Sequence, residues 1–348
     1  MASFASARAE LLANRDVPIS ESRATLVSLT DTWIQELATN ADVDSVEGAV
    51  IAVGGYGRKE LAPGSDLDLM LVVSPKADKE TVNRVAESLW YPIWDSGIRL
   101  DHSVRTITQV REMAAQDIKV VLGLLDARTV YGNDDLRQEF SRVVHQDWQA
   151  LGAKRLMELN VNVRERLERF GELAYLLEPD LKESFGGLRD ISVLQGIAAS
   201  GVTDVELSAL ANPREFLSDV RFALHQITGR NSDRLLLEVQ GAVAQRLGIA
   251  HEDDLLRAVC AAGRTMSYIS DLTWHRIKRF AAQAPRRKWN RTVLGARSPE
   301  LLPIAEGVVV LDGEAVLTPD ANPAADPVLI LRAAAAAAQH GVRLSPQS

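Results

Sequence analysis

The sequence predicts an α+β protein in which a mixed-sheet domain is followed by a helical domain. Within residues 49–74, two apolar runs flank a glycine-rich loop, and each run has the length and composition of a strand. Residues 97–107 alternate in polarity, which predicts a third strand. Beyond residue 148, apolar residues recur mostly at helical spacing, so this part of the chain is predicted to be mainly helical.

The first 44 residues are predicted to form a helical segment. The apolar spacing between Phe4 and Thr39 is that of a helix, and Pro18 predicts a break in it. Ser20 or Ser22 offers an N-cap for the part that follows. The apolar stripe of that second part consists of Leu26, Leu29, Trp33 and Leu37.

Residues 45–148 are predicted to form one domain that mixes helices and strands. After the first two strands, a helix is expected over Lys79–Asp95 and, beyond the third strand, another over Val110–Gln116. The apolar segment Val120–Val130 is expected to include a short fourth strand.

Residues 149–284 are predicted to form a helical bundle domain. Its first helix is expected to span Trp148–Leu177 and to end before Pro179. Further helices are expected over residues 192–199, 213–229, 235–247 and 255–280. Residues 285–348 are expected to form a linker and a short α/β region, with strands at 307–311 and 315–317 and an alanine-rich helix over 328–340.

Composition and charge restrict the class of protein. The net charge of −8 argues against nucleic-acid binding through overall charge, and the basic segment Ala284–Arg291 is interpreted as an interdomain linker. The single cysteine, Cys260, excludes an intramolecular disulfide and a cysteine-rich zinc site. No apolar run approaches the ~20 residues of a spanning helix, and the N-terminus does not resemble a secretory signal. We therefore expect a cytoplasmic protein with neither a membrane nor a nucleic acid as partner.

Two aspartates interrupt the second apolar run of the sheet domain. Because side chains alternate between the two faces of a strand, Asp66 and Asp68 point the same way. The intervening positions, Leu67, Leu69 and Leu71, point to the core. Adjacent carboxylates repel each other, and a divalent metal is the strongest partner that removes this cost. Carboxylate oxygens suit Mg²⁺, which shares its other positions with waters and phosphates.

A glycine pair precedes these aspartates. Gly54 and Gly55 follow directly on the first strand, where glycines let the backbone approach a phosphate and a helix start would aim N–H groups at it. A glycine pair alone usually marks a turn, and two aspartates alone often lie on a solvated strand face. Together, in this order and spacing, they indicate a triphosphate cradle facing a metal-binding carboxylate pair. Two metals in such a site support nucleotidyl transfer, since one activates the attacking oxygen and the other stabilises the leaving pyrophosphate.

The string GGYGRKELAPGSDLDLMLV, residues 54–72, resembles the DNA-polymerase-beta-like nucleotidyltransferase superfamily and, within it, the PII uridylyltransferases (GlnD). Four further strings resemble, in order, segments of that family's N-terminal half: WDSGIRLDHSVRT, DLKESFGGLRDI, RFALHQITGRNSDRLLLEVQGAVAQRLG and PDANPAADPVLIL. The resemblance covers most of the chain, and the GGLRD and RFALH strings are more diagnostic than the aspartate pair.

The resemblance implies roles for particular residues of the sheet domain. Gly54, Gly55, Arg58 and Ser65 would bind the nucleotide, and Asp66 and Asp68 would be catalytic ligands of two Mg²⁺ ions. A third carboxylate is expected on a neighbouring strand. Asp101 is assigned as this catalytic and metal-binding residue, and Asp126 is the alternative.

The GGLRD segment is predicted to bring the helical domain into contact with the nucleotide. Ligands often lie at domain interfaces, and Arg189 would offer a permanently charged fork to phosphate oxygens. Gly187 would permit close backbone approach, and Asp190 would orient Arg189 or support the metal site. The alternative is a turn that opens a helix, with Asp190 as its cap.

The resemblance implies Mg²⁺-dependent transfer of UMP from UTP to a tyrosine of the trimeric PII signal protein. AMP transfer from ATP remains an alternative, because the base is selected by contacts outside the phosphate motif. Two further hypotheses are an RNA-tailing nucleotidyltransferase, which the net charge disfavours, and a non-catalytic nucleotide-binding module, which the intact aspartates disfavour. The family's nucleotide-removing and glutamine-sensing segments have no counterpart in these residues, so we expect addition of nucleotide without removal.

Overall fold

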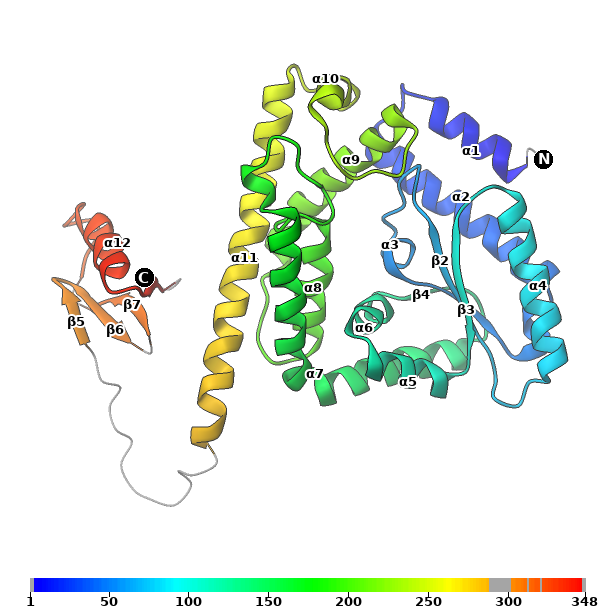
Figure 1. The fold of residues 1–348 in the computed structure, drawn as a ribbon, viewed down its shortest axis with the longest axis horizontal. Coiled ribbons are helices and arrows are strands. Elements are labelled where there is room, and N and C mark those ends of the chain that lie inside the picture. The colour runs from blue at the N-terminus through cyan, green and yellow to red at the C-terminus, as the bar shows by residue number, and fades with distance from the viewer. Residues whose placement is uncertain (1–2, 288–301, 312, 320, 346–348) are drawn as a thin grey trace. The chain divides into compact units, whose positions relative to one another are not determined.

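The computed structural model describes residues 3–287, 302–311, 313–319 and 321–345. The chain divides into two compact units, residues 1–282 and 283–348. Each unit combines helices with a four-stranded sheet, which confirms the predicted α+β class (Figure 1). The finer division at residues 44, 148 and 284 remains a prediction, and residue 148 lies inside one continuous helix.

The sheet of the first unit is mixed, as predicted. Its strands are β1 (Ala49–Ala52), β2 (Leu67–Val72), β3 (Leu100–Arg105) and β4 (Arg128–Gly132), in the order β3-β2-β1-β4. β1 is antiparallel to β2 and β4, whereas β2 and β3 are parallel. In the β2–β3 register, Asp68 stands opposite Asp101. The predicted third strand thus lies at an edge of the sheet, beside the strand that contains Asp68.

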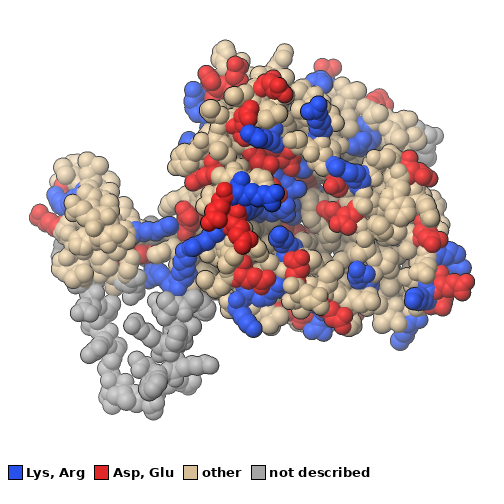
Figure 2. Space-filling view, in the orientation of Figure 1, with Lys and Arg blue, Asp and Glu red and all other residues tan. Residues whose placement is uncertain are grey.

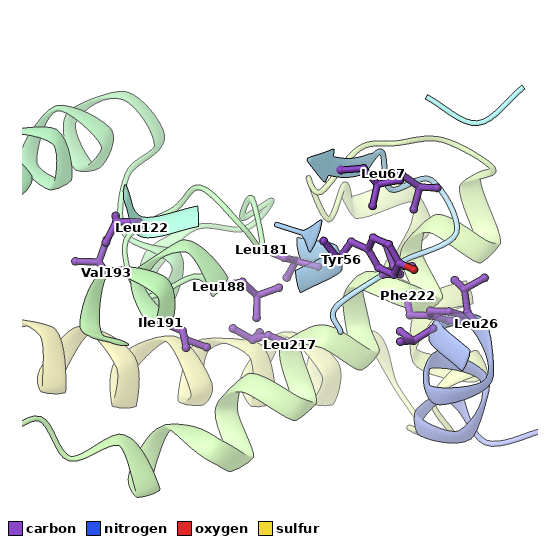
Figure 3. Packing of buried hydrophobic residues seen from close by; sticks show 14 of the residues in the cluster. Leu26, Tyr56, Leu67, Leu122, Leu181, Leu188, Ile191, Val193, Leu217 and Phe222 are labelled. Atoms are coloured by element: carbon purple, nitrogen blue, oxygen red, sulfur yellow. The ribbon is translucent and has the colours of Figure 1, made fainter. Parts of the chain in front are cut away.

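Both faces of this sheet are covered by apolar side chains. Leu67, Leu69 and Leu71 belong to the larger apolar cluster, which confirms that they face the core. Leu26 of the N-terminal helices and Phe222 of a later helix belong to the same cluster (Figure 3). Met70 and Val72 belong to a second cluster on the other face. Asp68 shares that second face with them.

Two helices precede the sheet. α1 spans Phe4–Ala13 and α2 spans Ile19–Asn40, so the predicted break falls at Pro18, directly before α2. The predicted serine cap is wrong, because Pro18 itself occupies the cap position of α2 and no side chain caps this end. Asp31 of α2 accepts hydrogen bonds from the Tyr56 hydroxyl at 2.7 Å and from Arg128 at 2.8 Å. These hydrogen bonds connect Tyr56, which follows the glycine pair, and Arg128 of β4 to the same helix.

The helices inserted between the strands follow the prediction with one exception. α4 spans Lys79–Asp95, and α5 spans Ile107–Gln116. The segment expected to hold a strand at 120–130 begins as helix α6 (Ile118–Leu125), and β4 starts only at Arg128. The valines and leucines of α6 favour a strand by composition, but their burial against both apolar clusters and an aspartate cap at residue 117 favour the helix.

The longest helix among the described residues, α7, spans Asp134–Phe170. The predicted range of 148–177 is therefore wrong at both ends. Asn133 caps the N-terminus by accepting a hydrogen bond from the Leu136 N–H. Gly171, with a φ of +69°, ends the helix well before Pro179, because glycine adopts this left-handed region without strain.

In the described part of the chain, α7 is followed by the helices α8 (Leu188–Ala199), α9 (Ala211–Thr228), α10 (Leu237–Arg246) and α11 (Glu252–Arg287), the last of which extends past residue 282. Short 3₁₀ turns, η1 (Val43–Val46), η2 (Leu173–Tyr175) and η3 (Leu207–Leu210), lie between elements. α8 packs against α6, α7 and α9, which places the GGLRD segment at the start of a central helix. None of the described helices has the length and apolar content needed to cross a membrane.

The second unit is a small α/β region. Its strands β5 (Leu302–Ala305), β6 (Val308–Leu311), β7 (Glu314–Leu317) and β8 (Arg343–Leu344) form a sheet in chain order. Helix α12 (Leu329–Gln339) packs Leu329, Ala333 and Ala337 with Val308 and Ala315, as the alanine-rich pattern predicted. The predicted basic linker begins as the end of α11, and its residues from Lys288 onward lie outside the described residues.

Candidate active site

A cavity of about 1070 Å³ lies within the first unit, between the sheet and the helices. This volume is ample for a nucleoside triphosphate. Eight of the predicted site residues line it: Gly54, Gly55, Arg58, Ser65, Asp66, Asp68, Asp101 and Arg189. Gly187 and Asp190 are not among the lining residues. Acidic and basic side chains are intermixed on the face of the molecule seen in Figure 2.

Asp68 and Asp101 lie side by side on one face of the sheet, because β2 and β3 pair in parallel and these two residues stand opposite each other. Burial, together with repulsion from Asp101 and Asp66, raises the pKa of Asp68 to about 6. Asp66 lies just before β2, and its Oδ1 is 2.7 Å from Nε of Arg99. Negative charge concentrated in this way is costly unless a cation shares it.

The three carboxylates supply the oxygen ligands that Mg²⁺ prefers. Among the described residues, however, no three acidic, histidine or cysteine side chains converge closely enough to hold one ion together. Asp66 faces Arg99 instead, so its side chain must rotate before it can join the other two. Asp68 and Asp101 require no backbone change, since the strand register already sets them side by side. The donor set thus fits Mg²⁺ in its chemistry, and Asp66 is the predicted ligand whose side chain would have to move.

The glycine turn, which is the one-turn helix α3 (Gly54–Gly57), lies against the Asp68 carboxylate. Gly54 has a φ of +56°, and a Cβ at this position would lie 2.6 Å from Oδ2 of Asp68. The position therefore requires glycine both for its backbone conformation and for space. Gly55 has no atom within 4 Å of its Cβ position, so its backbone is open to the cavity. The two glycines thus differ: Gly54 lets the backbone pack against the Asp68 carboxylate, and Gly55 leaves the backbone open to the cavity.

Arg58 and Asp126 form an ion pair with each other. Nη1 of Arg58 is 3.3 Å from Oδ2 of Asp126, and Nε of Arg58 is 2.6 Å from Oε2 of Glu60. Asp126 stands at the end of α6 and does not line the cavity. Of the two candidates for the third carboxylate, geometry favours Asp101.

The loop that leads into β2 is hydrogen-bonded to a cluster of three residues on and after α9: Arg221, His225 and Asp233. Nε of Arg221 donates to Oδ1 of Asp233 at 2.6 Å, and Nε2 of His225 lies 2.8 Å from the same oxygen. The Gly64 N–H donates to Nδ1 of His225 at 3.1 Å. Arg221 also donates to the carbonyl of Glu60 at 3.2 Å. This cluster of Arg221, His225 and Asp233 positions the residues directly before Asp66.

Sequence reasoning did not select this cluster, although its first two members lie in the RFALH string. Nothing in the local pattern of α9 indicates which part of the chain it contacts. The only available signal was the resemblance of that string to a known family.

We expect Asp233→Asn to destabilise the protein by about 2 kcal/mol, the typical cost of breaking a buried charged hydrogen bond. Burial opposes ionisation of Asp233, but His225 and Arg221 together hold its pKa well below the usual range. The stabilising effect of this carboxylate is therefore present above about pH 4 and is lost as the pH falls further. Chemical denaturation of both proteins as a function of pH measures this. A difference in stability that does not shrink in acid would contradict the assignment.

Lys182 is a second residue that sequence reasoning missed. It lines the cavity, and its ammonium group has no hydrogen-bond or ion-pair partner in the part of the chain that the structure describes. Burial lowers the pKa of Lys182, and the nearby positive charges of Arg221 and Arg189 lower it further. A half-buried cation without a partner is suited to receive an anionic ligand.

Some residues of the GGLRD segment line the cavity, and others are buried in the protein interior. Arg189 lines the cavity, and its Nη2 is 2.6 Å from Oε1 of Glu183. Asp190 is fully buried, where it pairs with Arg166 and accepts a hydrogen bond from the Gly186 N–H at 2.6 Å. A Cβ at Gly187 would lie 2.7 Å from the Ser184 carbonyl oxygen. For Gly187 and Asp190 the geometry therefore favours the helix-opening turn, but the predicted cap is wrong, because Gly187 is the N-cap and Asp190 lies in the first turn of α8. Of the three predicted site residues in this segment, only Arg189 lines the cavity.

Paired carboxylates and a glycine turn around a cavity of this size are typical of enzymes that act on phosphate groups. The family model described as GlnD PII-uridylyltransferase matches residues 154–200 and 192–274. A bifunctional uridylyltransferase/uridylyl-removing enzyme of Streptomyces coelicolor is 48% identical over 98% of this chain and 41% of its own length. The protein of the same name from Mycobacterium tuberculosis is 37% identical over 97% of this chain and 42% of its own. The chain belongs to the GlnD PII-uridylyltransferase family, and it spans about two fifths of the length of these relatives.

Proposed function

We propose that this chain catalyses Mg²⁺-dependent transfer of UMP from UTP to a tyrosine hydroxyl of a PII protein, with a polymerase-beta-like domain at residues 45–148. The observation that carries the proposal is the cavity lined by the glycine turn, the facing carboxylates Asp68 and Asp101, and Lys182. The name of the relatives supports UTP as the donor, and the description of the family model supports PII as the acceptor.

In this reaction the tyrosine oxygen bonds to the α-phosphorus of UTP, the bond to the bridging oxygen breaks, and pyrophosphate leaves. Asp66, Asp68 and Asp101 would hold two Mg²⁺ ions, whose chemistry is to activate the attacking oxygen and stabilise the leaving group. The open backbone at Gly55 admits a phosphate, and Lys182 supplies positive charge to it. The cluster of Arg221, His225 and Asp233 keeps the loop before Asp66 in place.

Mass spectrometry of purified PII after incubation with this chain, Mg²⁺ and either UTP or ATP tests the proposal. We expect UTP to add the mass of UMP to one tyrosine. Addition of AMP from ATP would instead establish adenylyl transfer. No modification of PII by either nucleotide, despite UTP binding to the chain, would refute transfer to PII. A parallel reaction with RNA as the acceptor tests the RNA-tailing hypothesis.

We expect Lys182→Met to raise the KM for UTP at least tenfold, which corresponds to about 1.4 kcal/mol, because methionine keeps the apolar stem but removes the charge. Steady-state kinetics with UTP as the varied substrate measures this. Lys79→Met, at an exposed position on α4, is the matched control and should leave the KM unchanged. Equal KM values for the two variants would place Lys182 outside the nucleotide site.

We also expect Arg189→Ala to weaken UTP binding or turnover at least about tenfold, again about 1.4 kcal/mol, without unfolding the protein. Glu183→Gln keeps the arginine but removes its ion-pair partner, so it separates the two roles. If Arg189 serves only to pair with Glu183, both variants will change the thermal melt alone. Unchanged kinetics for Arg189→Ala would remove this residue from the site.

A further inference from the structure

The outer edge of β3 is not paired to another strand in the described part of the chain. β3 ends the sheet order, with β2 as its strand neighbour. The carbonyls of Arg99 and Arg105 accept from the N–H groups of Leu67 and Val73, both at 2.9 Å. In a parallel pair such bonding residues alternate along the strand. The N–H and C=O groups of the intervening Leu100, His102 and Val104 therefore point away from β2.

One of these outward groups has a partner within the chain. The Val104 carbonyl accepts a hydrogen bond from Nη1 of Arg105 at 2.9 Å. For the outward amides and carbonyls of Leu100 and His102, and for the Val104 amide, the described residues provide no backbone partner. These groups form a template of donors and acceptors at strand spacing, which is the requirement for pairing with another extended chain.

An exposed aromatic cluster stands beside this edge. The side chains of Tyr91 and Trp94 on α4 are 56% and 43% exposed. Their ring centroids are 5.3 Å apart, and that of Trp94 is 5.2 Å from His102 on β3. Exposed aromatic residues grouped in this way are enriched where proteins bind one another.

The register of β3 relates this surface to the candidate active site. Asp101 pairs with Asp68 and shares its face, towards the cavity. His102 pairs with Leu69 and shares the other face, towards Trp94 of α4. A strand added beside β3 would alternate in the same way. One of its side chains would point to the cavity next to Asp101, and those on either side would contact the aromatic cluster.

We propose that the outer edge of β3, together with Tyr91, Trp94 and His102, binds an extended segment of the protein acceptor as a fifth strand. The inference rests on the proposed function, since it assumes that the acceptor is a polypeptide with a reactive hydroxyl side chain. Pairing of main chains supplies affinity, and alternation of side chains presents the acceptor residue to the carboxylates. The occupant is a polypeptide because unpaired N–H and C=O groups at strand spacing match another peptide backbone and not a lipid or nucleic acid.

Two variants of the chain test the surface without touching the candidate catalytic residues. The double variant Tyr91→Ala with Trp94→Ala removes the exposed rings. Val104→Pro removes an outward N–H that takes no part in bonding to β2, at a position that does not line the cavity. For each, we expect the KM for PII to rise at least tenfold, while the affinity for UTP with Mg²⁺ stays as in the wild type. Tyr268→Ala, on α11 and 63% exposed, is the matched control and should change neither value.

Amide hydrogen exchange gives a readout specific to strand addition. We expect residues 100–104 to exchange more slowly when PII is present and UTP is absent, and the double variant to lose this protection. An unchanged KM for PII in the double variant, or no protection of β3 by PII, overturns the inference. So does self-association of the wild type that protects β3 and is lost in the double variant. If the wild type fails to modify PII at all, the proposed function fails, which is a separate result.

Discussion

Asp68→Asn is expected to reduce UMP transfer to less than a tenth of the wild-type rate, a loss of more than about 1.4 kcal/mol. Asparagine keeps the shape of the side chain but removes the negative charge that a divalent metal requires. Asp68 is half-buried, faces Asp101 and has a pKa raised to about 6 by burial and by repulsion from Asp101 and Asp66. Removing that repulsion is expected to raise the melting temperature when no metal is present.

The corresponding variant of Asp66 is expected to lose transfer equally, but not to gain stability. Its carboxylate lies 2.7 Å from Arg99, so Asp66→Asn removes an exposed ion pair of little energetic value. Transfer rates measured on PII, beside thermal melts in a chelator, distinguish the two effects. Retention of more than about a tenth of the activity, within ~1.4 kcal/mol of the wild type, in either variant would refute its role as a metal ligand.

The choice between Asp101 and Asp126 is tested in the same assay. Asp101→Asn should lose transfer with little change in the melt, because Asp101 is exposed to the cavity. Asp126→Asn should lower the melting temperature, because Asp126 pairs with the partly buried Arg58. The reverse pattern would show that Asp126 is the third carboxylate.

Local sequence pattern was sufficient to predict which face of β2 is apolar and that a glycine pair precedes this strand. The two-residue period of a strand places Asp66 and Asp68 on one side, and the structure puts Leu67, Leu69 and Leu71 in the core as that period requires. The order of glycine pair, loop and aspartates then places the turn against Asp68, because β1 and β2 are antiparallel neighbours. Information carried by a few consecutive residues was enough here.

Features that depend on distant contacts could not be predicted in this way. Lys182 and Arg221 reach the cavity only because α8 packs against α6 and α9 packs against α2, and no local period specifies that packing. The start of α7 depends on a single capping side chain, Asn133, in a polar stretch. The helix at 118–125 shows burial overriding the strand preference of its valines. Tertiary packing decided the position of Lys182 and Arg221 and the helix at 118–125, whereas a local cap decided the start of α7.

Gly54→Ala is expected to reduce transfer at least about a hundredfold, roughly 2.7 kcal/mol, with only a moderate loss of stability. The Cβ would lie 2.6 Å from Oδ2 of Asp68, and this short side chain can rotate away. The fold therefore survives, but the carboxylate leaves its position opposite Asp101. The φ of +56° adds about 1 kcal/mol of backbone strain.

Gly97→Ala is the matched control, because Gly97 has a φ of +74° and no atom within 4 Å of its Cβ position. It carries similar backbone strain without the clash, so it should lose about 1 kcal/mol of stability and keep its transfer activity. Thermal melts and transfer rates on PII, measured for both variants, separate strain from displacement of the carboxylate. If the two variants keep the same activity, Asp68 tolerates a Cβ at Gly54, and the close fit between the glycine turn and this carboxylate has no catalytic role.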